Sequence, residues 1–396
     1  MSISSLLRPR AGLGYSLPCL APYPDLDVDP TTADLLVRYG FDRAGFESHK
    51  QRLLASSGGL EHDNLIRGRL EPPAPSDLVE LPAEESAEHG ALRARGERAI
   101  AAGEVGVVVL AGGMATRWGG AVKAIVDALP GRSFLSLKLD DVRKVAQRLS
   151  ARIPIYVIVS FSTHAPIESA VQDASRAWAP IELVPQSVSM RIFRNGELVR
   201  ESDGRPSLYA PGHGDLPLAL RRSGALASFR AAGGRTLFVS NVDNLAATLD
   251  PAVIGAHLTY GKAMSVEVVR SEPGDRGGAP ARVDGRLQIV EGFRFPPSFP
   301  IAHLPAFNTN TIVVDAATLE NDFPLSWFTV CKHVRGREVV QFERLVGELT
   351  AFVPASFLVV PRHAPFGRFQ PAKDPEELAA GRDAIRSILV RRGVLA

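Results

Sequence analysis

The chain has 396 residues, of which 45% are hydrophobic and 22% are charged, and its formal net charge is only +2. This composition is ordinary for a globular protein, and the balanced charge gives no reason to expect nucleic acid or an anionic membrane as a partner. Two cysteines, Cys19 and Cys331, are too few for a disulfide scaffold, and their spacing matches no zinc motif. The most apolar run, residues 105–111, is far too short to span a bilayer. Arginines interrupt the first twenty residues, which therefore do not resemble a signal peptide, and we expect a cytoplasmic protein.

The N-terminal part is expected to form an arm followed by a helix. Residues 1–25 are rich in Pro, Gly and Ser without a period, whereas Asp29-Pro30-Thr31 is typical of a capped helix start. Residues 71–85 contain several prolines and resemble a linker. We therefore predict an N-terminal arm and helical extension over 1–85. A main domain over 86–375 and a C-terminal helix over 376–396 are expected to follow.

Alternating helix and strand patterns begin near residue 84. Helices are predicted over residues 84–102, 134–149 and 217–231. Short apolar runs rich in β-branched residues lie between them, at 106–110, 155–159 and 236–239. Buried strands that alternate with helices imply a parallel sheet covered on both faces, with ligands beyond the carboxyl ends of the strands. Later segments predict strands within 263–289, a helix over 341–350 and a terminal helix over 375–395.

The first of these strands runs into a glycine-rich loop that ends near Gly120. Glycines let the backbone approach a ligand closely and offer amide donors. Arg117 adds a guanidinium that suits phosphate oxygens, and Lys123 follows within reach. The loop resembles a triphosphate cradle, although it has neither the P-loop nor the dinucleotide-binding spacing. Taken alone, it is explained equally well as a tight strand-to-helix turn whose glycines serve packing.

Further motifs follow in a fixed order along the chain. With the Leu-Ala-Gly-Gly-x-x-Thr-Arg-x-Gly loop, they are Gln186-Ser187, Pro211-Gly212-His213-Gly214-Asp215, Asn241-Val242-Asp243-Asn244-Leu245, Phe307-Asn308-Thr309-Asn310 and Arg368-Phe369-Gln370-Pro371-Ala372-Lys373. The motifs occur in the same order as in the UDP-glucose/UDP-N-acetylglucosamine pyrophosphorylase family. The chain therefore resembles this family from about residue 92 to residue 373. The Pro-Gly-His-Gly and Asn-Thr-Asn forms favour the UDP-glucose branch.

The resemblance implies a fold and a reaction. The fold is α/β, with a Rossmann-like, mostly parallel sheet of the sugar nucleotidyltransferase (GT-A-like) type and a helical N-terminal extension. The chain ends soon after Lys373, so the C-terminal β-helix of eukaryotic relatives is not expected. Residues 86–375 would be a catalytic domain that moves a uridylyl group from UTP to a sugar 1-phosphate by in-line displacement, with Mg²⁺ as cofactor. Glucose 1-phosphate is the expected acceptor. N-acetylglucosamine or galactose 1-phosphate, or a binding protein that has lost catalysis, remain alternatives.

The resemblance also assigns roles to individual residues. The nucleotide-binding set is Gly112, Gly113, Gln186, Gly212, His213 and Gly214; the phosphate-binding catalytic set is Arg117, Lys123 and Lys373; the metal ligand is Asp243; and the sugar-binding set is Gly278, Glu291, Asn308 and Asn310. A carboxylate that ends a buried strand suits Mg²⁺, although an aspartate there could cap the next helix instead. His213 is not expected to be a general base, because the attacking phosphate is already an anion. Asp215 is expected to cap the helix that follows it.

The sequence departs from the family pattern in three places. Ala115 stands where a glycine is usual, and Val122 replaces the proline before Lys123, which also lies one residue closer to the loop. The segment between Pro361 and Arg368 is longer than usual, and its His363 and Phe366 are candidates for altering substrate choice. No motif predicts an oligomeric state.

Overall fold

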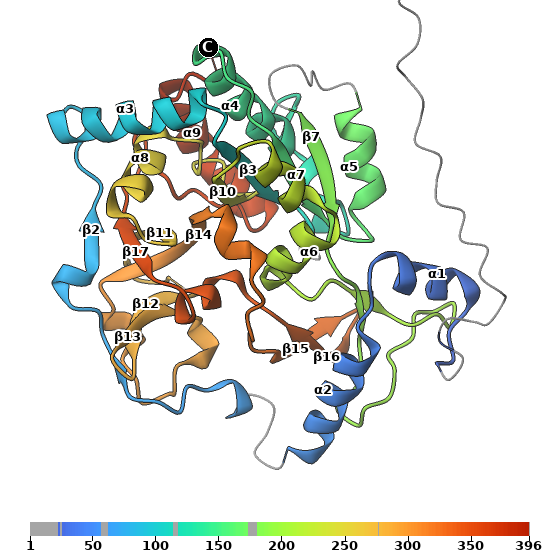
Figure 1. The fold of residues 1–396 in the computed structure, drawn as a ribbon. Coiled ribbons are helices and arrows are strands. Elements are labelled where there is room, and N and C mark those ends of the chain that lie inside the picture. Colours follow the sequence, from blue (N-terminus) through green and yellow to red (C-terminus); the bar gives the residue numbers. More distant parts are fainter. Residues whose placement is uncertain are drawn as a thin grey trace, which may run out of the picture.

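A mostly parallel sheet of eight strands forms the centre of the molecule (Figure 1). A computed structural model of the chain describes residues 23, 26–56, 62–113, 118–172, 180–275 and 277–395. Neighbouring strands are parallel except where β14 runs antiparallel between β10 and β11. In sheet order the strands are β2 (Leu78–Glu80), β17 (Ala355–Val359), β11 (Met264–Arg270), β14 (Ala306–Asp315), β10 (Thr236–Asn241), β3 (Val105–Leu110), β6 (Ile155–Val159) and β7 (Ile181–Pro185). The predicted parallel sheet is therefore confirmed.

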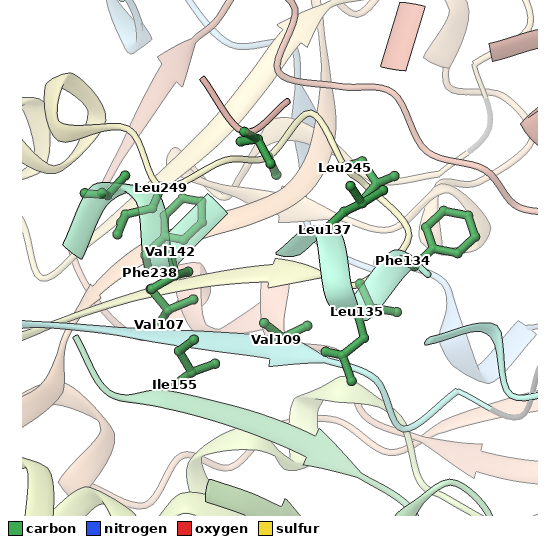
Figure 2. Packing of buried hydrophobic residues seen from close by; sticks show 14 of the residues in the cluster. Val107, Val109, Phe134, Leu135, Leu137, Val142, Ile155, Phe238, Leu245 and Leu249 are labelled. Carbon is green, nitrogen blue, oxygen red and sulfur yellow. The ribbon is translucent and has the colours of Figure 1, made fainter. Parts of the chain in front are cut away.

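Two apolar layers cover the faces of this sheet. Alternate residues of β3 divide between them, because successive side chains of a strand point to opposite faces: Val107 and Val109 join one cluster, and Val108 joins the other. Figure 2 shows Val107 and Val109 in the first cluster, below side chains from α4. The helices that contribute to the first cluster are α3 (Ala87–Ala101), α4 (Phe134–Arg148), α5 (His164–Val171), α8 (Pro251–Tyr260) and α9 (Pro375–Arg391). The helices that contribute to the second cluster are α6 (Leu216–Arg222) and α7 (Ala225–Ala231).

Most of the predicted helices are present, with two differences. The helix expected over 217–231 is two helices, because Gly224 adopts a left-handed conformation with φ +79° between them. The helix predicted over 341–350 is wrong: strand β16 (Arg337–Glu343) is followed by a 3₁₀ helix, η9 (Val346–Ala351). Strand β16 pairs with β15 (Phe328–Val334) and its residues 339–342 are buried in succession, so tertiary packing outweighs the helical propensity of this segment.

The N-terminal helices pack on two hairpins beside the main sheet. Helix α1 (Pro30–Arg38) is capped by the Asp29 carboxylate, as predicted, and α2 (Arg43–Ala55) follows it. Both contribute to an apolar cluster with β8 (Ser189–Met190), β9 (Leu208–Tyr209) and β16. In Figure 1, α2 lies beside the β15–β16 hairpin.

The segment expected as a linker contributes strands instead. Strand β2 lies within residues 71–85 and pairs in parallel with β17 at the edge of the main sheet. Strand β1 (Leu70–Glu71) joins a three-stranded sheet with β12 (Ala279–Val283) and β13 (Arg286–Val290). The domain boundaries at residues 85 and 375 stay predictions.

The remaining elements are short. They are β4 (Asp127–Leu129), β5 (Arg132–Ser133), η1 (His62–Asn64), η2 (Pro75–Asp77), η4 (Lys123–Ile125), η5 (His213–Asp215), η6 (Gly292–Arg294), η7 (Ile301–His303) and η8 (Ala316–Glu320). Within the described ranges, no helix combines the length and apolarity that crossing a bilayer requires.

Candidate active site

Two adjoining cavities lie beyond the carboxyl ends of β3 and β10, where the ligand of such a sheet is expected. The larger has a volume of about 530 Å³ and the smaller about 210 Å³. They share four lining residues, His213, Asn241, Asp243 and Lys373. Because β14 is antiparallel, its first residues reach this same edge of the sheet, and they line the smaller cavity. The two cavities together form one cleft with a narrow polar junction.

The glycine-rich loop borders the larger cavity. Gly112 and Gly113 follow β3 after Ala111 and line the cavity together with Gln186. A Cβ atom on Gly112 would lie 1.8 Å from Gln186 Nε2, so no side chain fits there while Gln186 keeps its place. Gln186 is 5% exposed, and its backbone amide donates to the carbonyl of Val159 at 2.9 Å. The structure thus brings these three predicted residues together, whereas Arg117 and Ala115 lie outside the described residues.

The Pro-Gly-His-Gly loop is held by close backbone packing. Gly212 has φ +90°, and a Cβ atom there would lie 2.6 Å from the Arg344 carbonyl oxygen. A Cβ atom on Gly214 would lie 2.4 Å from the Leu345 nitrogen. Gly212 borders the larger cavity, but Gly214 borders neither cavity and packs against residues 344–345 instead.

Asp215 does not cap the helix that follows, contrary to expectation. Its buried carboxylate accepts a hydrogen bond from the Ser187 amide at 2.6 Å and pairs with the Arg344 guanidinium at 2.6 Å. These charge-assisted bonds connect the glutamine segment to the loop at Gly212, and both Gln186 and Gly212 line the larger cavity. Asp215 lines neither cavity and is therefore a structural residue that holds these two lining segments together.

His213 has no lone pair available for base catalysis. Its Nδ1 accepts a hydrogen bond from the Val346 amide at 3.0 Å, so the proton of the neutral ring is on Nε2. Burial lowers the pKa of this imidazole to about 4, so the ring is neutral near pH 7. The expectation that His213 acts as a loop residue and not as a general base agrees with this geometry.

The junction of the cavities carries the charged groups. Lys123 Nζ lies 2.8 Å from Asp243 Oδ2, although Val122 replaces the expected proline and the spacing is short. Both side chains are partly exposed, at 17% and 19%. Trp118 lies beside them: its ring centroid is 5.8 Å from Lys123 Nζ, and its indole N–H donates to the Lys373 carbonyl at 3.0 Å. In the part of the chain that the structure describes, no carboxylate lies within ion-pair distance of the Lys373 ammonium.

A buried arginine, Arg368, helps to connect the segment that contains Asp243 to the segment that contains Lys373. Arg368 is fully buried, donates to both oxygens of Glu267 at 2.6 and 2.8 Å, and bonds the Thr248 carbonyl at 3.0 Å. The Asn244 side chain accepts from the Gln370 amide at 3.0 Å. Breaking such a buried pair typically costs about 3–5 kcal/mol, because it leaves an uncompensated charge. The two segments are therefore rigidly connected.

The predicted sugar residues all line the smaller cavity: Gly278, Glu291, Asn308 and Asn310. The Asn308 amide donates to the Gly278 carbonyl at 2.9 Å, which joins the loop after β11 to β14. Asn310 has φ +57°, and its Nδ2 donates to Asn241 Oδ1 at 3.0 Å. The β14–β11 register shifts at this point, and this short irregular stretch of β14 places both asparagines in the lining of the smaller cavity.

Burial raises the pKa of Glu291 to about 7, although the nearby Arg294 guanidinium opposes the shift. A Cβ atom on Gly278 would lie 3.2 Å from this carboxyl group, so the glycine leaves room for it beside the cavity. A buried carboxyl group that faces a polar cavity has lost the water that would solvate it. Ligand hydroxyl groups are suitable replacement donors.

Sequence reasoning missed one wall of the larger cavity. The β15–β16 hairpin contributes Lys332, His333, Gln341 and Glu343 to its lining, and Arg191 and Trp118 also line it. Residues 328–330 and 340–343 alternate between apolar and polar types on either side of the Arg335-Gly336 turn, and this was the available signal for the hairpin. Neither His363 nor Phe366 borders either cavity.

Comparison with known proteins agrees with the motif-based resemblance. The family model for UTP–glucose-1-phosphate uridylyltransferase matches residues 66–385. The UTP–glucose-1-phosphate uridylyltransferase of Saccharomyces cerevisiae is 27% identical over 295 residues, which are 69% of this chain and 58% of that protein. The enzyme of the same name from Hordeum vulgare is 26% identical over 357 residues, 85% of this chain and 72% of that protein. The match covers 61% of a relative from Dictyostelium discoideum, so the chain spans about three fifths of several curated relatives.

Solved structures share the fold. A UDP-N-acetylglucosamine pyrophosphorylase from Trypanosoma brucei, crystallised with an inhibitor, aligns with a TM-score of 0.72 and 21% identity, covering 89% of this chain and 77% of that one. A UDP-glucose phosphorylase from the same organism aligns with a TM-score of 0.66 and 24% identity, covering 90% and 75%. At these identities the likeness supports the architecture.

Proposed function

Because the chain belongs to the UTP–glucose-1-phosphate uridylyltransferase family, we propose that it makes a UDP-sugar and pyrophosphate from UTP and a sugar 1-phosphate, with glucose 1-phosphate as the acceptor. The observation that carries this proposal is the cleft itself. Its larger cavity has a glycine-lined wall, its smaller cavity is lined by amides and a carboxyl group, and the two meet at Asp243 and Lys373. A reaction that joins a nucleotide to a phosphorylated sugar needs two adjoining pockets with charged groups at the boundary.

The proposed chemistry is a direct displacement. A phosphate oxygen of the sugar 1-phosphate attacks the α-phosphorus of UTP, the new P–O bond forms, and the bond from that phosphorus to the β-phosphate oxygen breaks as pyrophosphate leaves. The protein's part is to hold two anions in line and to offset their charge. Lys123 and Lys373 would serve the UTP phosphates and the sugar phosphate, respectively, and Arg117 would assist in the loop. Gly112, Gly113, Gln186 and Gly212 would face the nucleotide.

Mg²⁺ fits this site as an ion that arrives with the nucleotide. The described residues contain no group of three or more His, Cys, Asp or Glu side chains that could hold a metal by themselves. Mg²⁺ commonly binds one or two carboxylates and takes its other ligands from phosphates and water. Asp243 meets that need, since it lies at the junction with one oxygen on Lys123. When bound, the ion would neutralise phosphate charge, and Lys123 would be released to the triphosphate.

The sugar would occupy the smaller cavity. Asn308 and Asn310 can donate to and accept from hydroxyl groups, and Glu291 can accept from them. Its volume of about 210 Å³ is less than half that of the larger cavity, which is consistent with a single sugar ring beside a nucleotide. The low cysteine content supports a reducing compartment such as the cytoplasm as the place of this reaction.

The decisive experiment measures pyrophosphate release from UTP and Mg²⁺ with glucose, galactose and N-acetylglucosamine 1-phosphates. We expect release that depends on glucose 1-phosphate and stops when Mg²⁺ is chelated. Release with another sugar 1-phosphate would mean that the acceptor is not glucose 1-phosphate but that the reaction is still uridylyl transfer. If UTP binds but no sugar supports release, the chain is a nucleotide-binding protein on this fold and the enzymatic proposal is wrong.

A further inference from the structure

Arg362 is a partly buried arginine in the segment 361–368, which is expected to be longer than the family pattern. Its guanidinium makes a two-pronged contact with Asp275, at 2.7 Å to Oδ1 and 2.9 Å to Oδ2. The same group lies 3.1 Å from the Glu272 carboxylate and donates to the Arg270 carbonyl at 3.0 Å. The Arg362 and Asp275 side chains are each only 16% exposed. This one side chain therefore ties the segment before Arg368 to the loop that follows β11.

Both partners of this contact continue into the smaller cavity. The loop after β11 leads to Gly277 and Gly278, which line that cavity. On its other side, the Arg362 guanidinium lies 5.6 Å from the ring centroid of Phe369, which is itself 5.6 Å from the ring of Phe307. Phe307 and Phe369 also line the cavity. Arg362 therefore contacts the segments that supply two walls of the smaller cavity, although it does not line the cavity itself.

The contact with Arg362 also controls the ionisation of the Asp275 carboxyl group. Burial alone would raise the pKa of Asp275, but the hydrogen bonds from Arg362 hold it below its usual value, and Lys373 acts in the same direction through space. The carboxylate therefore lies within the electrostatic reach of the lysine proposed to hold the sugar phosphate. Arg362 supplies the closer cation and neutralises it.

We propose that Arg362 is a positioning residue for the sugar 1-phosphate: it clasps the loop after β11 against the Phe369 wall and prevents Asp275 from competing with the sugar phosphate for Lys373. The inference rests on the proposed function, since it names the substrate whose binding the clasp controls. It also assigns a role to the longer 361–368 segment, in which His363 extends the clasp by contacting Glu272 at 2.6 Å.

The contact differs from an ordinary surface pair. Arg270 and Glu80 lie nearby and also form an ion pair, but both side chains are 58% exposed, and neither lines a cavity. Exposed pairs contribute little because solvent screens them, whereas a two-pronged contact in a partly buried site fixes geometry. Arg270→Ala is therefore a matched control, since the backbone carbonyl that Arg362 uses is retained.

The test compares Arg362→Ala, Arg362→Lys, the double variant Arg362→Ala with Asp275→Asn, and Arg270→Ala. We expect Arg362→Ala to raise the KM for glucose 1-phosphate about tenfold while the KM for UTP changes less than about twofold, because misplacement affects one substrate. Arg362→Lys, which keeps the charge without the fork, should give roughly a threefold rise. The double variant should recover at least about half of the loss on a logarithmic scale, because it removes the unpaired carboxylate.

A merely structural arginine would give a different pattern. In that case the double variant would be no better than Arg362→Ala, or both KM values would change together, and either result would overturn the inference. Hydrogen exchange of the amides in residues 271–275 gives a readout independent of turnover: Arg362→Ala should accelerate it and Arg270→Ala should not. An inactive wild-type chain would contradict the proposed function, whereas unchanged exchange in Arg362→Ala would contradict the clasp itself.

Discussion

The two sides of the cleft are built by different means. On the nucleotide side, the backbone approaches other groups so closely that a Cβ atom on Gly112 or Gly212 would lie 1.8 or 2.6 Å from its nearest neighbour. On the sugar side, the corresponding distance at Gly278 is 3.2 Å, and the lining comes from the side chains of Glu291, Asn308 and Asn310. Close packing at two glycines therefore constrains the shape of the first side, whereas the second side is lined mainly by exchangeable side chains.

This difference has a consequence for specificity. A wall made of backbone accepts few substitutions, so it suits the substrate part that stays constant, the nucleotide. A wall made of amide and carboxyl side chains can be retuned by one or two hydrogen bonds, each about 1–3 kcal/mol in discrimination. We therefore expect substitutions on the nucleotide side to affect UTP, those on the sugar side to affect the sugar phosphate, and those at the junction to affect both.

The largest effect is expected at the junction, with Asp243→Asn. The change keeps the shape and removes the charge that the proposed metal and Lys123 both use. We expect kcat/KM to fall about 100-fold or more for both substrates, since charge stabilisation of a transferring phosphoryl group is lost. Steady-state kinetics across a Mg²⁺ titration measures this. Asp322→Asn, at a carboxylate that is 94% exposed, is the control; near-normal rates in Asp243→Asn would remove this residue from the metal proposal.

The next largest effect is expected from Gly112→Ala, with Gly90→Ala in helix α3 as its control. The new Cβ atom at position 112 would collide with the Gln186 amide, which can swing away, so we expect the fold to survive. The KM for UTP should rise about 10- to 100-fold because Gln186 loses its position. Gly90 lines neither cavity and no atom lies within 4 Å of a Cβ atom there, so that variant should stay within about twofold of wild type. Equal effects at both glycines would contradict a backbone-defined nucleotide wall.

The same contrast explains what could be predicted from the sequence. The strands at 105–110, 155–159 and 236–241 and their glycine-rich ends were predictable, because buried β-branched runs and glycines are local signals. The fit of Gly112 against Gln186 was not, since these residues are 74 positions apart and the β3–β6 and β6–β7 pairings are both needed to bring Gln186 to the loop. The motif supplied the residues, and the sheet register supplied their contact.

The sugar side depends more strongly on tertiary structure. Glu291 follows the last strand of the small sheet, whereas Asn308 begins an antiparallel strand of the large one, and no periodicity links them. The predicted helix over 341–350 concealed the β15–β16 hairpin, so its contribution to the larger cavity was missed. Asp215 was expected to serve its own helix, but its carboxylate binds residues far away in sequence, Ser187 and Arg344. Local rules identify such residues without identifying their partners.

The smallest of these effects is expected on the sugar side, with Glu291→Gln. The variant keeps one acceptor oxygen but loses the negative charge, so kcat/KM for the sugar 1-phosphate should fall about tenfold while the KM for UTP is unchanged. Because the pKa of Glu291 is raised to about 7, the wild-type kcat/KM for the sugar should increase as pH rises through 7, and this limb should be absent in Glu291→Gln. A pH profile of both proteins measures it, with the exposed Glu320→Gln as the control. An unchanged limb in Glu291→Gln would assign the ionisation to another group.

The free energy of unfolding should also depend on the Glu291 carboxyl group, but this contribution should fall as pH rises, whereas kcat/KM for the sugar should increase. Its pKa is raised from 4.5 to about 7 by folding, so between these values the folded chain binds a proton that the unfolded chain has released. The contribution of Glu291 to the free energy of unfolding is therefore fully present below pH 4.5 and is lost as pH rises through about 7. Relative to wild type, Glu291→Gln should gain stability between about pH 5 and about pH 8 in urea unfolding. If the chain binds the sugar 1-phosphate better at the pH at which Glu291 destabilises the fold, then Glu291 is kept in the cavity for binding at a cost to stability. A difference in the free energy of unfolding between Glu291→Gln and wild type that is the same at about pH 5 and about pH 8 would contradict that account.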